Sequence, residues 1–344
     1  MKAEQPFLPA EWYEQSGVQL TWPHAGTDWK RMLTEVQECF SKIAKHIADH
    51  ESLLIVAPHI EGPRRQLKAA GVNMQNVKLV ECPTNDTWAR DHAAITLIDN
   101  EECQLLDFTF NGWGLKFPAD LDNLIARRIF DADIFHAKYV NKHGFVLEGG
   151  SIESDGAGTL LTTEDCLLSP NRNGEMDKND IEAYLCSVFN LQRVLWLKHG
   201  YLEGDDTDGH IDTLARFCPN NTIAYVQCCN EEDEHYNELH LMEQELRAFR
   251  TIEGEPYRLL PLPFPSPISM EGLRLPATYA NFLVINGAVL YPTYNQPEND
   301  NEAKDVLQQA FPDYEIIGID CRALIKQHGS LHCVTMQYPK NVLQ

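Results

Sequence analysis

The sequence is short of basic residues and lacks a long apolar run. Of its 344 residues, 28 are Lys or Arg and 51 are Asp or Glu, so the formal net charge is −23. Binding to nucleic acid or to an anionic membrane needs clustered Lys and Arg, and we therefore expect neither partner. No uninterrupted apolar run of about 18 residues occurs, and polar side chains are spread through residues 1–20, so no membrane span or signal peptide is predicted. The expected location is the cytoplasm.

Several common functional motifs are also missing. The sequence contains no Gly-x-Gly-x-x-Gly, P-loop, His-Glu-x-x-His or Gly-x-Ser-x-Gly pattern, which removes the usual support for dinucleotide, nucleotide, zinc-protease and serine-hydrolase sites. There is no Cys-x-x-Cys pair among the ten cysteines, and Cys228 and Cys229 are adjacent, which does not suit a bridge between them. We interpret most cysteines as reduced, small apolar side chains, and we predict no metal and no cofactor.

What the chain does contain is enough apolar material for a large core, since 43% of its residues are hydrophobic. Short runs rich in Val, Ile and Leu predict strands at 53–57, 77–82, 94–98, 104–108, 158–162, 194–197, 222–227, 282–285 and 316–319. Apolar side chains at steps of three and four predict helices at 32–47, 180–189, 236–249 and 302–311.

Thr27 and Asp28 are the capping candidates for the first of these helices. The Pro-rich residues 261–267 are interpreted as a loop. No Gly/Ser linker or low-complexity stretch divides the chain. The fold class is therefore α/β, and we expect one domain over residues 1–344.

Two polar stretches stand out in the first half of the chain. Residues 85–91, Asn-Asp-Thr-Trp-Ala-Arg-Asp, place two carboxylates, an indole and a guanidinium close together, although this stretch taken alone is better explained as a turn with an internal Asp–Arg pair. Glu148 follows an apolar run and precedes Gly149 and Gly150, which permit tight backbone turns. It could point from a strand end into a cavity, or it could be an exposed residue of a hairpin.

Two further stretches lie in the second half. In an extended segment His210 and Asp212 would face the same side and supply a base and an acceptor. A calcium loop competes for the Asp-rich residues 205–212, but the EF-hand Glu at the twelfth position is missing. Cys333 stands near the start of an apolar run, where packing is the ordinary role. If Cys333 is a nucleophile, His210 is a better partner than His332, because adjacent strand residues point to opposite faces.

Together and in this order, these stretches resemble the agmatine deiminase and Porphyromonas-type peptidylarginine deiminase family. The matching segments are 86–91, 148–150, 209–212, 278–282 and 331–335, with 111–114 and 171–173 most similar to the compact bacterial agmatine deiminases. One departure is visible, since Gly329 and Ser330 stand where many members have a longer Gly run. The resemblance covers most of the chain. It implies the pentein fold, a five-bladed α/β propeller of ββαβ modules with pseudo-fivefold symmetry.

The resemblance also implies a reaction, the hydrolysis of agmatine to N-carbamoylputrescine and ammonia in putrescine biosynthesis. Cys333 would be the nucleophile, and His210 would act first as general acid and then as general base. Asp91 and Asp212 would hold the guanidinium by charge-assisted hydrogen bonds. Glu148 would bond to the substrate or to His210.

Other residues are expected to bind substrate rather than react. Trp88 could stack on the cation, and Asn281 lies in a matching segment. The far ammonium of agmatine needs an acidic subsite, for which Asp86, Asp206 and Asp208 are candidates because they adjoin the motifs.

Alternatives remain open at this point. The same residues could deiminate free or peptidyl arginine, transfer an amidino group, or bind cationic amines without catalysis, and a purely structural protein is a further possibility. The peptidyl branch resembles the chain less, because it is secreted and carries an added domain. The expected partner is a small cationic guanidine, and the family makes a homo-oligomer plausible.

Overall fold

The structure, a computed structural model, describes residues 5–99 and 102–344. Four of its sheets share one strand pattern, in which the first strand is antiparallel to the second and the second is parallel to the third. Their strands are β4 (Ile95–Leu97), β5 (Gln104–Thr109) and β6 (Lys138–Val146); β7 (Ile152–Ser154), β8 (Thr159–Thr163) and β9 (Arg193–Leu197); β10 (Ala215–Cys218), β11 (Thr222–Gln227) and β12 (Arg258–Pro263); and β15 (Leu283–Ile285), β16 (Ala288–Thr293) and β17 (Glu315–Asp320).

A fifth sheet joins the two ends of the chain. Its order is β18-β1-β2-β3, with β18 antiparallel to β1 and the other neighbours parallel. The strands are β1 (Gln15–Thr21), β2 (Ser52–Ala57), β3 (Val77–Glu81) and β18 (Thr335–Pro339). The first strand of this sheet therefore comes from the C-terminal end of the sequence; β18, β1 and β2 repeat the pattern of the other four sheets, and β3 adds a parallel strand at the edge.

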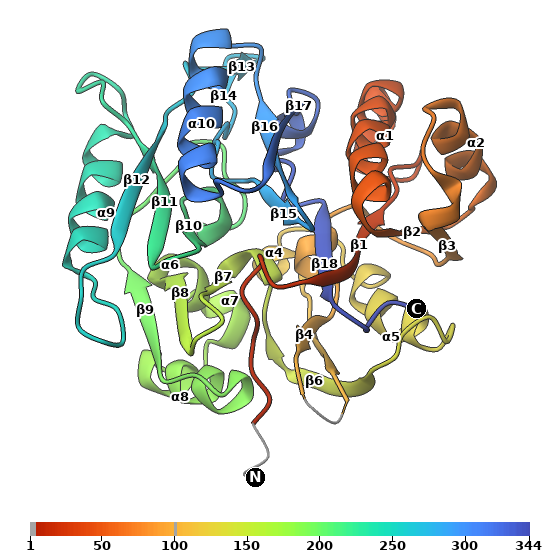
Figure 1. The fold of residues 1–344 in the computed structure, drawn as a ribbon, viewed down its shortest axis with the longest axis horizontal. Coiled ribbons are helices and arrows are strands. Elements are labelled where there is room, and N and C mark those ends of the chain that lie inside the picture. The colour runs from red at the N-terminus through yellow and green to blue at the C-terminus, as the bar shows by residue number, and fades with distance from the viewer. Residues whose placement is uncertain (1–4, 100–101) are drawn as a thin grey trace.

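Helices connect the parallel strands, because a connection between two parallel strands must cross over the sheet and needs a dozen or more residues. They are α1 (Leu33–His50), α2 (Glu61–Ala69), α4 (Gly112–Leu115), α5 (Ile125–Phe130), α6 (Glu164–Leu167), α7 (Pro170–Asn173), α8 (Lys178–Phe189), α9 (Tyr236–Ala248) and α10 (Pro297–Ala310). In Figure 1 the longer helices lie toward the outside and the sheets toward the middle. Val36, Phe40, Ile43 and Ile47 of α1 are fully buried, so its apolar face packs inward.

Short elements occupy other connections, both within and between the sheets. They are α3 (Ala89–His92), the hairpin of β13 (Ser269–Met270) and β14 (Leu273–Arg274), and the 3₁₀ turns η1 (Asp28–Met32), η2 (Met74–Asn76), η3 (Asp122–Leu124), η4 (Gly149–Ser151), η5 (Ile211–Thr213) and η6 (Leu324–Gln327). In the part of the chain that the structure describes, no helix has the length and apolarity to cross a membrane.

The α/β class and the nine predicted strands are confirmed to within one or two residues, and the four predicted helices are present, three of them with shifted starts. Two details were wrong. Pro261 and Pro263 lie in β12 rather than in a loop, which is possible because β12 is an edge strand. Thr27 precedes the turn η1 instead of α1, and its side chain makes no capping bond.

The pairing of β1 with β18 yields a test of stability. Tyr338 is fully buried and donates its hydroxyl to Gln19 Oε1 at 2.7 Å. Tyr338→Phe would leave this buried acceptor unpaired and should cost about 1–3 kcal/mol of unfolding free energy. Urea denaturation measures the change. The control is Tyr13→Phe at a half-exposed position, where a change within about 0.5 kcal/mol is expected; equal effects at both positions would contradict the assignment.

Candidate active site

Five connections, one entering the first strand of each repeated sheet, bring polar side chains to one place. Asp91 lies in α3 before β4, Gly150 in η4 before β7, and Asp212 in η5 before β10. Asn281 and Cys333 each stand two residues before a strand, β15 and β18 respectively. Because the sheets repeat the same strand order, equivalent connections reach the same region from five directions.

Cys333 is buried and lies close to an amide and a carboxylate. Its thiol is 3.4 Å from Asn281 Oδ1 and 3.8 Å from Asp212 Oδ2. Asn281 also accepts from the backbone N–H of Cys333 at 3.3 Å, which fixes the turn that presents the thiol. Burial, followed by the charges of Asp212 and Asp91, raises the pKa of the Cys333 thiol well above its ordinary value. The thiol is therefore neutral in the free protein.

The carboxylate of Asp91 accepts hydrogen bonds from two neutral donors, and no cation in the described part of the chain donates to it at hydrogen-bond distance. Its Oδ1 accepts from the backbone N–H of Gly150 at 3.0 Å, and its Oδ2 accepts from Trp113 Nε1 at 2.9 Å. Burial nevertheless raises its pKa to about 6. A Cβ on Gly150 would stand 2.5 Å from His210 Nδ1 and 2.9 Å from Asp91 Oδ1, so only glycine lets these side chains approach one another.

His210 is buried between two carboxylates. Its Nε2 lies 3.4 Å from Glu148 Oε2, and its Nδ1 lies 3.7 Å from Asp91 Oδ1. Burial alone would lower the pKa of His210, but the carboxylate of Asp91 and the hydrogen bond to Glu148 are among the effects that raise it well above the ordinary value. The ring is therefore an imidazolium at neutral pH, with a proton on Nδ1 available for transfer.

Glu148 is compensated by a second cation. Arg172 Nε donates to Glu148 Oε2 at 2.8 Å and to Oε1 at 3.1 Å, and both side chains are fully buried. Burial would raise the pKa of Glu148, but His210 and Arg172 outweigh it and lower the pKa below its ordinary value. Of its two expected roles, the structure therefore places Glu148 against His210.

A cavity of about 690 Å³, open to solvent, leads to Cys333. Aromatic and acidic side chains dominate its wall, namely Trp88, Trp113, Phe117, Asp28, Asp86, Asp91, Asp205 and Asp206. Asp86 accepts from Trp88 Nε1 at 3.2 Å through Oδ2, and its buried Oδ1 has no partner among the described residues. Burial and the nearby carboxylates of Asp122 and Asp28 raise the pKa of Asp86 to about 7.

One group of possible metal ligands lies in this region. Glu148, Cys166 and His210 each place a donor atom within 4.8 Å of the others. Arg172 donates to both carboxylate oxygens of Glu148, so a guanidinium already occupies the position of positive charge. The donor set therefore does not suit a metal ion.

Comparison with known proteins agrees with this geometry. The Porphyromonas-type peptidyl-arginine deiminase family matches residues 7–339. The chain belongs to this family. A curated relative in Ectopseudomonas mendocina, an agmatine deiminase, is 33% identical over 98% of this chain and 96% of its own length. A solved C. jejuni agmatine deiminase, a cysteine-to-serine variant with substrate bound, is 39% identical with a TM-score of 0.91, covering 100% of this chain and 99% of that one.

Two other structures mark the range of similarity. A Porphyromonas gingivalis protein, provisionally named an arginine deiminase, is 50% identical with a TM-score of 0.94 and covers 99% of this chain and 100% of its own. The dimethylarginine dimethylaminohydrolase of Pseudomonas aeruginosa is only 12% identical, with a TM-score of 0.50 over 95% of this chain and 100% of that chain. The second likeness shows a shared fold.

The structure brings together most of the side chains that the sequence singled out for this family member. Asp91, Glu148, His210, Asp212, Asn281 and Cys333 converge, and Trp88, Asp86 and Asp206 line the cavity. Two expectations differ. Asp208 does not line the cavity but pairs with Lys116 and Arg172. His210 stands at the start of the η5 turn rather than in an extended segment, so the alternation argument that paired it with Asp212 was wrong.

Sequence reasoning missed several residues that complete the site. Trp113 and Arg172 lie in stretches that matched the family, but they received no role. Asp28 was interpreted as a helix cap and lines the cavity. Nothing in the sequence pointed to Glu11, which contacts His332 at 2.7 Å behind the site.

The neutral thiol predicts a charge-dependent reactivity. At pH 7 Cys333 should react slowly with uncharged iodoacetamide, because little thiolate is present. A haloacetamidine, which is a planar cation, should label it about tenfold faster or more, since one unit of thiol pKa is a tenfold change in thiolate.

Peptide mass spectrometry measures both labels. Exposed Cys229 is the internal control and should show no such preference for the cation. Equal labelling of Cys333 and Cys229 by iodoacetamide at pH 7 would contradict the argument.

Proposed function

We propose that this protein is an agmatine deiminase. The observation that supports this most directly is the convergence of a thiol, an imidazolium and a free carboxylate at the end of an acidic cavity, formed by Cys333, His210 and Asp91. A guanidinium is a planar cation that carboxylates bind by charge-assisted hydrogen bonds. The names of the curated and solved relatives, and the substrate-bound cysteine-to-serine variant among them, support the same activity.

The first half of the reaction would be driven by the substrate charge. The guanidinium would bind Asp91 and Asp212, and its positive charge would lower the pKa of the adjacent Cys333 thiol, whose proton would leave to the solvent in the open cavity. The thiolate sulfur would attack the guanidinium carbon, and His210 Nδ1 would give its proton to the departing nitrogen. The carbon–nitrogen bond breaks, ammonia leaves, and an amidino group remains on the sulfur.

Water completes the second half. Neutral His210 would take a proton from water as the oxygen attacks the amidino carbon, and Glu148 would stabilise the imidazolium that forms again. The carbon–sulfur bond then breaks and its electron pair returns to Cys333 as thiolate, the hydroxyl proton leaves as the carbonyl forms, and the thiolate takes up a proton once the product has left. The product carries a ureido group, which for agmatine is N-carbamoylputrescine, an intermediate on the route from arginine to putrescine.

The cavity wall supports agmatine over arginine. Four acidic residues other than Asp91 line the cavity, and among the described residues neither Lys nor Arg does. An ammonium at the far end of the substrate would meet carboxylates, with Asp86 and Asp206 as the proposed subsite. The α-carboxylate of free arginine, or of a C-terminal arginine in a peptide, would meet the same acidic side chains and be repelled.

The remaining expectations concern architecture and context. We propose that the five sheets are the blades of a pseudo-fivefold propeller forming one catalytic domain over residues 1–344, because all five share a strand pattern and β18 completes the sheet begun by β1. Trp88 lines the cavity beside the expected guanidinium position, which supports its proposed stacking role. A homo-oligomer, a cytoplasmic location and the absence of a cofactor stay predictions.

Ammonia release is the direct test of function. Purified protein should release ammonia from agmatine and far less from arginine or from a peptide with C-terminal arginine. Cys333→Ser should lower turnover at least about 10³-fold because the nucleophile is lost. Cys229→Ser, at an exposed cysteine, is the matched control and should retain activity. If ammonia is released chiefly from arginine, the substrate is arginine and not agmatine. If none of the three compounds releases ammonia, the proposal is wrong.

The titration of Asp86 predicts a pH dependence of binding. Its pKa is raised to about 7, so the carboxyl group is neutral below that pH and charged above it. Because only the charged form attracts an ammonium, KM for agmatine should fall as pH rises through about 7. Asp86→Asn should raise KM by about 10-fold and flatten this dependence, with kcat changed less. Asp49→Asn, on exposed helix surface, is the control; an unchanged KM profile in Asp86→Asn would remove Asp86 from the subsite.

A further inference from the structure

A buried chain of contacts lies behind Asp212, and the reaction as described does not use it. His332 stands between two carboxylates, with Nδ1 2.7 Å from Asp212 Oδ2 and Nε2 2.7 Å from Glu11 Oε2. All three side chains are buried. Carboxylates only accept, so each ring nitrogen donates where it carries a proton. Arg216 Nη2 also lies 3.1 Å from Nε2. These contacts fix the His332 ring at both ends.

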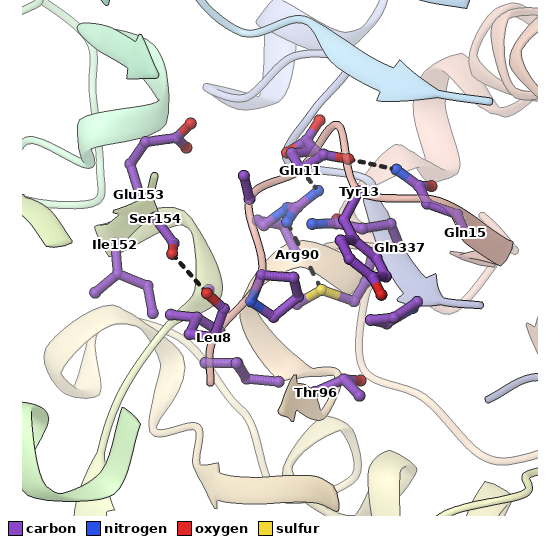
Figure 2. Close-up of a pocket in the computed structure, with 16 residues that line it drawn as sticks. Leu8, Glu11, Tyr13, Gln15, Arg90, Thr96, Ile152, Glu153, Ser154 and Gln337 are labelled. Carbon is purple, nitrogen blue, oxygen red and sulfur yellow. Dashed lines mark hydrogen bonds and ion pairs between the residues drawn. The ribbon is translucent and has the colours of Figure 1, made fainter. Parts of the chain in front are cut away.

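Glu11 is itself held by several groups. Its Oε2 also accepts from Arg216 Nη2 at 2.7 Å, and its Oε1 accepts from the backbone N–H of Val284 at 2.7 Å. Arg216 in turn donates to Glu153 Oε2 at 2.9 Å. Figure 2 shows Glu11 beside Arg90 on the wall of a second cavity. Arg90 Nη2 lies 3.8 Å from Glu11 Oε2. Glu11 is therefore an immobile support for His332.

These contacts leave one oxygen of Asp212 for the substrate. Oδ2 accepts from His332, whereas Oδ1 is buried and has no hydrogen-bond partner among the described residues. Because the other end of His332 is anchored on Glu11, the carboxylate cannot rotate without breaking a charge-assisted hydrogen bond.

We propose that His332 and Glu11 are positioning residues for deimination, which orient Asp212 and keep it ionised so that Oδ1 receives a guanidinium N–H. This inference rests on the proposed function, and it adds two residues that do not touch the reacting atoms. His332 is adjacent to the nucleophile Cys333 in sequence. It thus acts on the carboxylate of Asp212 and is not the base for Cys333.

The electrostatics agree with this geometry. Burial would raise the pKa of Asp212, but the hydrogen bond and the charge of His332 outweigh it and hold the pKa below its ordinary value. The other ionisable groups that act on Asp212 or that Asp212 acts on are His210, Arg216, Arg90, Asp91 and the Cys333 thiol. Removing the His332 ring should let burial dominate the pKa of Asp212, so the acidic limb of kcat/KM should move to higher pH.

Two substitutions separate the two ends of the ring. In His332→Asn the side-chain NH₂ can take the place of Nδ1 and donate to Asp212, whereas in His332→Gln it can take the place of Nε2 and donate to Glu11. If orientation of Asp212 matters, His332→Asn should keep kcat/KM for agmatine within about tenfold of the parent protein, and His332→Gln should lose about 100-fold, the range seen when outer hydrogen-bond partners are removed. Both substitutions should shift the acidic limb of the kcat/KM profile to higher pH. Thermal melts check that the two variants are equally folded.

A second readout does not depend on agmatine turnover. Labelling of Cys333 by the cationic haloacetamidine needs Asp91 and Asp212 but no agmatine hydrolysis, so it should follow the same order, parent above His332→Asn above His332→Gln.

If His332→Gln does not fold, Glu11→Gln replaces it, because this variant keeps an acceptor for Arg216 but loses the charge facing His332. It too should slow labelling and move the acidic limb to higher pH. If the parent protein does not hydrolyse agmatine but the labelling rates still follow this order, the agmatine proposal is wrong and the positioning role stands. Equal labelling in both His332 variants with an unmoved acidic limb would overturn the positioning role.

Discussion

The site depends on a deficit of positive charge around buried carboxylates. Glu148 is compensated by His210 and Arg172, and Asp212 is compensated by His332. Asp91 and Asp86 have only neutral donors at hydrogen-bond distance, and burial raises their pKa to about 6 and about 7 respectively. Two carboxylates are thus left for a ligand that brings its own charge. Agmatine, the proposed substrate, carries two cationic ends.

The same deficit controls the nucleophile. Burial and the nearby carboxylates keep Cys333 protonated in the free protein, which protects a buried thiol from ionising without a partner. A bound guanidinium would reverse that balance at the position where the thiolate is needed. Activation of the thiol and recognition of the substrate would therefore be one electrostatic event, and an uncharged molecule of similar shape would not start the reaction.

The repeated sheet supplies the geometry for this balance. One connection from each sheet reaches the site, and backbone groups tie the connections together: the Gly150 N–H binds Asp91 at 3.0 Å, and the Arg90 N–H binds the Cys333 carbonyl at 3.1 Å. Gly150 has no side chain at the point where His210, Asp91 and Asp212 meet. The proposed catalytic groups are thus fixed by short contacts between these connections, which is the pre-organisation that charge stabilisation requires.

The sequence by itself determined the α/β class, the nine strands it named and, through a family resemblance, most of the side chains that gather around Cys333. These follow from apolar periodicity and from residue types in compact motifs, both of which are local properties. Pro261 and Pro263 escaped this reasoning because an edge strand tolerates proline, and only the sheet order shows which strand is at an edge. The tertiary structure alone decided which carboxylates are neutralised and which wait for a cation. Glu11 and His332 are 321 residues apart in sequence yet 2.7 Å apart in space, and no local pattern reports a charge balance set by residues that distant.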